Sequence, residues 1–184
     1  MGNKINYNTR KIIPYFIVFC VILLSYSCKK LITYDSFSLE KTEYKGSSLR
    51  IDGYYYQKET NNEYCRLECY YSDGVLLHMG GQFTTFEEMD NYVNSVFIQK
   101  KVQTNDKESW GLFIIENNVI KTERYYPTDQ FRKPLYIKEG YVVDDSTFHI
   151  SVSYRSNGTE WGTNDETYHF RKYSPKPDST QTFL

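Results

Sequence analysis

The chain has 184 residues, a formal net charge of −1 and an aromatic fraction of 17%, with 19 tyrosines. This length leaves room for one domain of ordinary size with appended segments. The near-zero charge argues against the basic surface that nucleic-acid binding requires, so we expect no nucleic acid among its partners. The tyrosine-rich composition favours strands and aromatic-lined surfaces or cavities.

The N-terminal segment is organised like a secretory signal. Basic residues precede an apolar run over 12–24, which at about 13 residues is short for a membrane span and typical of a signal peptide. The stretch LLSYSC that ends at Cys28 resembles the lipobox of bacterial lipoproteins. The resemblance implies a signal peptide over 1–27 and acylation of Cys28, which would anchor the mature chain to a membrane. A plain secreted protein and a short N-terminal anchor helix are the alternatives.

The residues after Cys28 indicate where the protein is located and how the β domain is linked to its membrane anchor. Lys29 and Lys30 follow it, whereas surface-exported lipoproteins resemble one another in having acidic residues there. The resemblance therefore implies an outer-membrane protein of the cell envelope that faces the periplasm. Residues 28–48 are therefore expected to hold the acylated cysteine, which the resemblance implies, and a flexible tether, which their mostly polar composition without a sustained period predicts.

From residue 49 onward, apolar and polar residues alternate with the period of a β-strand. We expect strands at 49–56, 63–71, 75–81, 109–115, 119–125, 134–143, 147–154 and 166–173. Asp73-Gly74 and Asn117-Asn118 predict tight hairpin turns between neighbouring strands. The β domain is expected to cover 49–174, and the Pro-containing tail over 175–184 is expected to be mobile.

One segment, 84–103, has helical rather than strand periodicity. Thr85 and Glu88 match a capping box at its start, and apolar residues then recur at helical spacing. The later strand 109–115 is apolar on both faces, so both faces need a cover. We expect the helix to pack outside the sheet as that cover, with a lid over a cavity as the alternative.

Eight strands joined mainly by short turns predict a mainly β fold: an antiparallel up-and-down barrel with one inserted amphipathic helix. Together with the Cys28 segment, the stretches 109–126 and 166–180 resemble small lipocalin-like lipoproteins of bacteria. The resemblance implies a barrel that holds a small apolar or amphiphilic ligand. Such a pocket would be lined by four residues, Leu77, Trp110, Phe148 and Phe170. The alternative is a barrel filled by its own side chains, acting as a structural module or one that interacts with an envelope protein or glycan.

No residue set points to catalysis, a cofactor or a metal ion. Alternation in 75–81 predicts Leu77 and Met79 inside, and strand parity predicts all three histidines, His78, His149 and His169, outside without an obvious third metal ligand. Cys65 and Cys69 lie four residues apart on one strand, about 13 Å at about 3.3 Å per residue. That separation is too long for a disulfide, so we expect two buried thiols.

Overall fold

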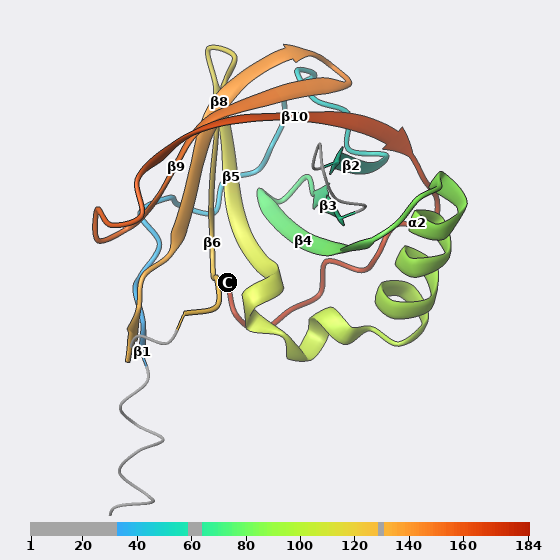
Figure 1. Cartoon of the computed structure of the whole chain (residues 1–184), viewed down its shortest axis with the longest axis horizontal. Helices are drawn as coiled ribbons and strands as arrows, with labels where there is room; N and C mark the ends of the chain where they lie inside the picture. The colour runs from blue at the N-terminus through green and yellow to red at the C-terminus, as the bar shows by residue number, and fades with distance from the viewer. Residues whose placement is uncertain (1–32, 59–63, 129–130) are drawn as a thin grey trace, which may run out of the picture.

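The structure, a computed structural model, describes residues 33–58, 64–128 and 131–184. The lipobox and Cys28 lie outside the described residues. Eight strands form a closed barrel in the order β10-β2-β3-β4-β5-β6-β8-β9, and every neighbouring pair is antiparallel. The expected up-and-down barrel with an inserted helix is therefore confirmed (Figure 1).

The strand bounds lie close to those expected from the alternation. The barrel strands are β2 Gly53–Lys58, β3 Tyr64–Tyr70, β4 Val75–Gln82, β5 Trp110–Glu116, β6 Val119–Arg124, β8 Tyr136–Asp144, β9 Thr147–Arg155 and β10 Gly162–Lys172. Two short strands, β1 Thr33–Tyr34 and β7 Arg132–Lys133, pair in parallel outside the barrel. The turn residues Gly74, Asn117 and Asn118 have φ values of 81°, 50° and 64°, the left-handed geometry that tight hairpins need.

The inserted segment begins as expected and then departs from a single helix. Thr85 caps α2 (Phe86–Tyr92), and both bonds of the capping box with Glu88 are present. The chain continues as a π-helix, η1 (Val93–Gln99), and then, after Lys101 at φ 48°, as the 3₁₀ turns η2 (Val102–Asn105) and η3 (Lys107–Ser109). Within the described residues, no helix is both long enough and apolar enough to cross a bilayer.

The barrel wall separates two apolar cores. The outer core lies between α2–η1 and strands β2 to β5, and it contains Met89, Val93, Leu77, Met79 and Trp110. The helix is thus confirmed as an outside cover, and Figure 1 shows it beside the barrel. The inner core fills one end of the barrel, with members Leu49, Tyr55, Tyr70, Leu76, Phe113, Ile120, Phe148, Ile150 and Tyr168.

The faces of β4 are the reverse of those expected. Leu77 and Met79 point outward beneath the helix, while Leu76 and His78 point into the barrel. The physical reason is that the helix buries the outer face of β4 as completely as the barrel buries its inner face. Apolar character on alternate residues therefore marks the helix contact, and the less apolar face lines the interior.

The described part of the expected tether is packed on the barrel, which corrects that prediction for 33–48. The Glu123 carboxylate accepts hydrogen bonds from the backbone N–H groups of Ser38 and Leu39, at 2.8 and 2.9 Å. The ring of Tyr44 contacts Phe113, and its hydroxyl accepts a bond from the backbone of Leu49 at 2.7 Å. A buried carboxylate with backbone donors holds this segment against β6.

The C-terminal tail is also docked rather than mobile. The Tyr71 hydroxyl donates to the Pro177 carbonyl at 2.9 Å. The Lys176 ammonium donates to the carbonyls of Ile51 and Tyr70 at 2.7 and 2.8 Å. Phe183 and Leu184 pack against the outer core. The tail therefore covers apolar surface of the outer core that the barrel and helix leave exposed.

Candidate ligand-binding cavity

The four residues expected to line a pocket are not brought together. Leu77 and Trp110 lie in the outer core, on the opposite side of the wall from the barrel interior. Phe148 belongs to the inner core, and Phe170 packs half-buried against it. None of the four borders the barrel cavity described below, so the structure does not bring the expected lining together.

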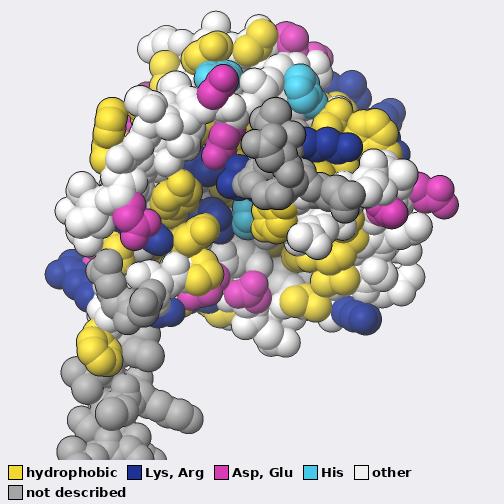
Figure 2. Space-filling model, in the orientation of Figure 1, with side chains coloured by type: hydrophobic (Ala, Val, Ile, Leu, Met, Phe, Trp, Pro, Cys, Tyr) yellow, Lys and Arg dark blue, Asp and Glu magenta, His cyan; other side chains and the backbone are white. Residues whose placement is uncertain are grey.

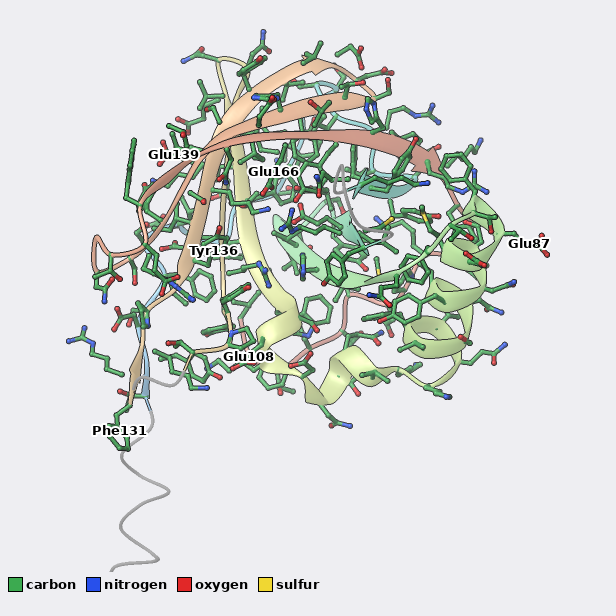
Figure 3. The ribbon with its side chains drawn as sticks, viewed as in Figure 1. Glu87, Glu108, Phe131, Tyr136, Glu139 and Glu166 are labelled. Carbon is green, nitrogen blue, oxygen red and sulfur yellow. The ribbon has the colours of Figure 1, made fainter. Side chains whose placement is uncertain are left out.

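A cavity of about 510 Å³ occupies the other end of the barrel, beyond the inner core. Strands β3, β4, β6, β8 and β10 supply its walls, and η1, η2 and η3 border it on one side. Figure 2 shows a hollow on this face, with basic and histidine side chains deep inside it. Figure 3 shows Tyr136, Glu108 and Glu166, from β8, η3 and β10, around the opening. Its volume is in the range of small-molecule sites.

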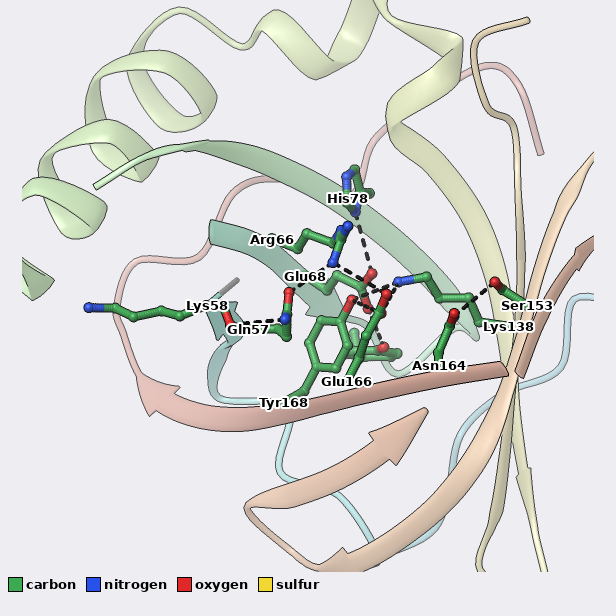
Figure 4. A network of polar contacts seen from close by, with 11 residues as sticks. Gln57, Lys58, Arg66, Glu68, His78, Lys138, Ser153, Asn164, Glu166 and Tyr168 are labelled. Carbon is green, nitrogen blue, oxygen red and sulfur yellow. Dashed lines mark hydrogen bonds and ion pairs between the residues drawn. The ribbon is translucent and has the colours of Figure 1, made fainter. Parts of the chain in front are cut away.

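Next to His78 in the cavity wall lies the carboxylate of Glu68, which is 2% exposed. The Tyr70 hydroxyl donates to it at 2.6 Å, and Nδ1 of His78 lies 3.3 Å from its other oxygen (Figure 4). Burial by itself raises the pKa of Glu68, but the His78 hydrogen bond and the charge of Lys138 outweigh burial and lower that pKa to about 2. Glu68 is therefore ionised at neutral pH.

His78 stays neutral beside this carboxylate. Burial and the nearby charge of Arg124 lower the pKa of His78 to about 4, against the opposing effect of Glu68. Because an ionised carboxylate only accepts hydrogen bonds, the His78 proton resides on Nδ1 and points at Glu68. The expected outward position of His78 is wrong, since the histidine belongs to the cavity wall.

Above Glu68 lies a second network centred on Glu166. Its carboxylate is 2.7 Å from the Lys138 ammonium and 3.3 Å from Nη1 of Arg66. Lys138 also donates to the Tyr168 hydroxyl at 2.8 Å, and Arg66 donates to Gln57 at 3.0 Å (Figure 4). One carboxylate thus bridges two cations from opposite sides of the barrel, β3 and β8.

Arg124 completes the basic lining and is placed by its strand partner. Its register partner on β5 is Gly111, where an added Cβ would lie 2.5 Å from the Arg124 Cβ. The absence of a side chain at Gly111 therefore gives Arg124 room inside the barrel. The guanidinium carbon lies 4.6 Å from the ring centre of Tyr126 and 5.9 Å from that of Tyr136. Stacking of this kind holds a guanidinium in one plane.

The remaining expected residues lie away from the cavity. His149 and His169 are on the outer face, as expected, and they are diagonal rather than opposite, because their register partners are Thr167 and Thr147. Among the described residues, no group of three or more potential ligands is arranged to hold a metal ion. Cys65 and Cys69 are buried in the outer core without a disulfide, as expected.

The two buried groups predict how stability responds to acid. The pKa of His78 is about 4 in the folded protein and 6.5 as its ordinary value, so as pH falls through this interval the unfolded chain takes up a proton that the folded chain refuses. We expect a loss of up to about 3 kcal/mol between pH 7 and pH 4 from this group. Below pH 4.5 protonation of Glu68 adds to it. Urea unfolding at pH 7, 5.5 and 4.5 measures this loss.

In His78→Gln, stability is expected to change much less between pH 7 and 4.5, because the group that titrates there is gone. His169→Gln is the matched control, since His169 is exposed on β10, and it is expected to follow the parent protein. Equal acid sensitivity of the parent and His78→Gln would contradict a neutral buried His78.

The residues that dominate the cavity, Arg66, Arg124, Lys138 and Glu166, were missed from the sequence. A usable signal was present in β3, where Arg66 and Glu68 alternate with Cys65 and Leu67. Polar residues on one face of a strand whose other face is strongly apolar ordinarily indicate a face turned toward solvent. In a barrel covered by a helix, that polar face is the interior.

Comparisons with protein-family models, with curated proteins and with solved structures find no match for this chain. No relative therefore assigns a ligand, and the residues of the cavity alone indicate its chemistry.

Proposed function

We propose that this protein is a lipid-anchored component of the bacterial cell envelope whose barrel binds a small amphiphilic ligand. Its membrane contact would be the acylated Cys28, and the barrel would present its cavity to the envelope space. The observation that carries the ligand-binding part is the cavity of about 510 Å³ inside the barrel. The anchoring part is supported by the LLSYSC segment and the apolar run before it.

The cavity favours a ligand over a self-filled structural barrel. The inner core packs only one end of the barrel with side chains, and the other end is hollow. The lining combines aromatic and aliphatic residues, such as Tyr92, Val96 and Phe97, with the basic groups at its base. A wholly apolar ligand would leave the buried Nε of Arg124, which has no hydrogen-bond partner among the described residues, unsatisfied, which is unfavourable. An amphiphile satisfies both parts of the lining.

Mass spectrometry of the full chain, purified from bacterial membranes in detergent, tests both parts of the proposal. We expect a mature protein that begins at an acylated Cys28 and that releases a small amphiphile on denaturation. Val96→Trp places a large ring at the cavity border and is expected to reduce ligand occupancy by roughly tenfold, the effect of about 1.4 kcal/mol. Val143→Trp, at an exposed position, is the control and is expected to retain the ligand.

The anchoring part and the ligand-binding part of the proposal are contradicted by different results. A mature chain that begins elsewhere and carries no acyl group contradicts anchoring. An acylated chain from which no small molecule is released, in the parent and in both variants, contradicts ligand binding. Circular dichroism of each variant shows that the barrel has formed.

A further inference from the structure

The cationic side chains of the cavity differ in how completely their charges and hydrogen-bond donors are paired. Arg66 and Lys138 both pair with Glu166. Arg124, which is 5% exposed, has no carboxylate within ion-pair distance in the parts of the chain that the structure describes. Its Nη1 donates to the Glu108 carbonyl at 3.4 Å, and its buried Nε has no hydrogen-bond partner among the described residues. A buried guanidinium in this state is costly to the folded protein.

The acidic groups near Arg124 are committed elsewhere. The Glu108 carboxylate accepts from the Tyr34 hydroxyl at 2.8 Å and pairs with Lys133 at 3.2 Å. The Asp106 carboxylate accepts from the Ser109 hydroxyl and from the backbone of Glu108. Glu68 is occupied by Tyr70 and His78. None of these carboxylates therefore makes a direct ion pair with Arg124, and the charge of Glu68 acts on Arg124 only without direct contact.

Arg124 is also held in position. Tyr126 lies 4.6 Å from the guanidinium carbon of Arg124 and, at the same distance, from that of Arg155. The two arginines thus share one ring, and Tyr136 lies beside it at 5.0 Å between ring centres. A guanidinium fixed in this way loses little freedom when it binds an anion, and its planar donors match a carboxylate.

We propose that the ligand is an amphiphile with a single carboxylate, which binds Arg124, and an apolar or aromatic body, which packs against the η1 side of the cavity. This inference deepens the proposed function and rests on it. A ligand carboxylate supplies the direct ion pair that Arg124 lacks among the described residues, and its oxygens accept the hydrogen bond that Nε of Arg124 lacks there. The body contacts Val96 and Phe97 from η1, which line the same cavity.

The test uses the full chain in lipid nanodiscs, titrated calorimetrically with 4-phenylbutyrate and with its neutral counterpart 4-phenylbutyramide. We expect the carboxylate to bind more tightly than the amide. Arg124→Met is expected to weaken carboxylate binding by roughly thirtyfold or more, the usual effect of deleting one partner of a buried charge pair. Amide binding is expected to remain unchanged. Arg132→Met makes the same substitution at an exposed arginine outside the cavity and is the matched control.

A second measurement separates binding from folding. Because Arg124 is a buried charge with no direct ion pair among the described residues, Arg124→Met is expected to raise the ligand-free melting temperature, whereas loss of a structural arginine would lower it. Arg124→Lys keeps the charge and is expected to recover part of the carboxylate affinity. Equal binding of the acid and the amide, unaffected by Arg124→Met, overturns the carboxylate inference and leaves the ligand-binding barrel standing. Absence of binding by either compound overturns both.

Discussion

Glu166→Gln is expected to destabilise the ligand-free protein by about 3–5 kcal/mol, the usual result of removing one partner of a buried ion pair. Glu166 pairs with Lys138 at 2.7 Å, and the two side chains are only 15% and 5% exposed. Without the carboxylate, Lys138 and Arg66 would remain inside the barrel near a third cation, Arg124. Chemical unfolding in urea at pH 7 gives the difference in free energy.

The double variant Glu166→Gln with Lys138→Met is expected to recover much of that loss, because it removes the stranded ammonium as well. The control is Glu43→Gln. Glu43 pairs with Lys45 on the surface, where both side chains are more than half exposed, and its loss is expected to cost less than about 1 kcal/mol. If Glu166→Gln and Glu43→Gln had equal small effects, the Glu166 network would be screened by water and would not stabilise the barrel.

Trp110→Ala is expected to cost about 3–5 kcal/mol, as large aromatic deletions in a packed core do. Trp110 is fully buried in the outer core. Its indole N–H donates to the Gln103 carbonyl at 2.8 Å, so the substitution removes a hydrogen bond as well as packed volume. It would loosen the helical segment from the outside of β5. Thermal and urea unfolding measure the change.

Trp161→Ala provides the comparison, because Trp161 is 65% exposed on the loop before β10 and its removal is expected to stay within about 0.5 kcal/mol. A small effect at Trp110 would mean that the helix cover contributes little to stability. A Trp110 variant that folds normally but binds ligand differently would return this residue to the cavity, against its position in the outer core.

Local sequence patterns were enough to predict the strands and the turns that connect them. Period-two alternation located all eight barrel strands within a few residues, and Gly74, Asn117 and Asn118 marked their turns. The capping box at Thr85 located the start of the helix. These features depend on neighbours in the chain, such as a side chain that reaches a backbone group three residues away. They can therefore be predicted from the sequence without knowledge of the tertiary fold.

The residues that line the cavity could not be predicted from local sequence in this way. Alternation separates the two faces of a strand but does not say which face turns inward, and for β4 the expected direction was reversed. The usual guide, that apolar residues face the core, fails when a helix buries the outer face too. Leu77 and Trp110 were therefore placed in a pocket that they do not line.

The sequence by itself determined the class of fold, the number and order of strands, and the inserted helix, because these follow from local period and turn chemistry. Only the tertiary structure decided where the appended segments go: Ser38 and Leu39 bind Glu123, and Pro177 accepts from Tyr71. It also decided the cavity. Arg124 meets Lys138 and Glu166 only when β6, β8 and β10 curve around one axis, since barrel closure brings together residues that are distant in the chain.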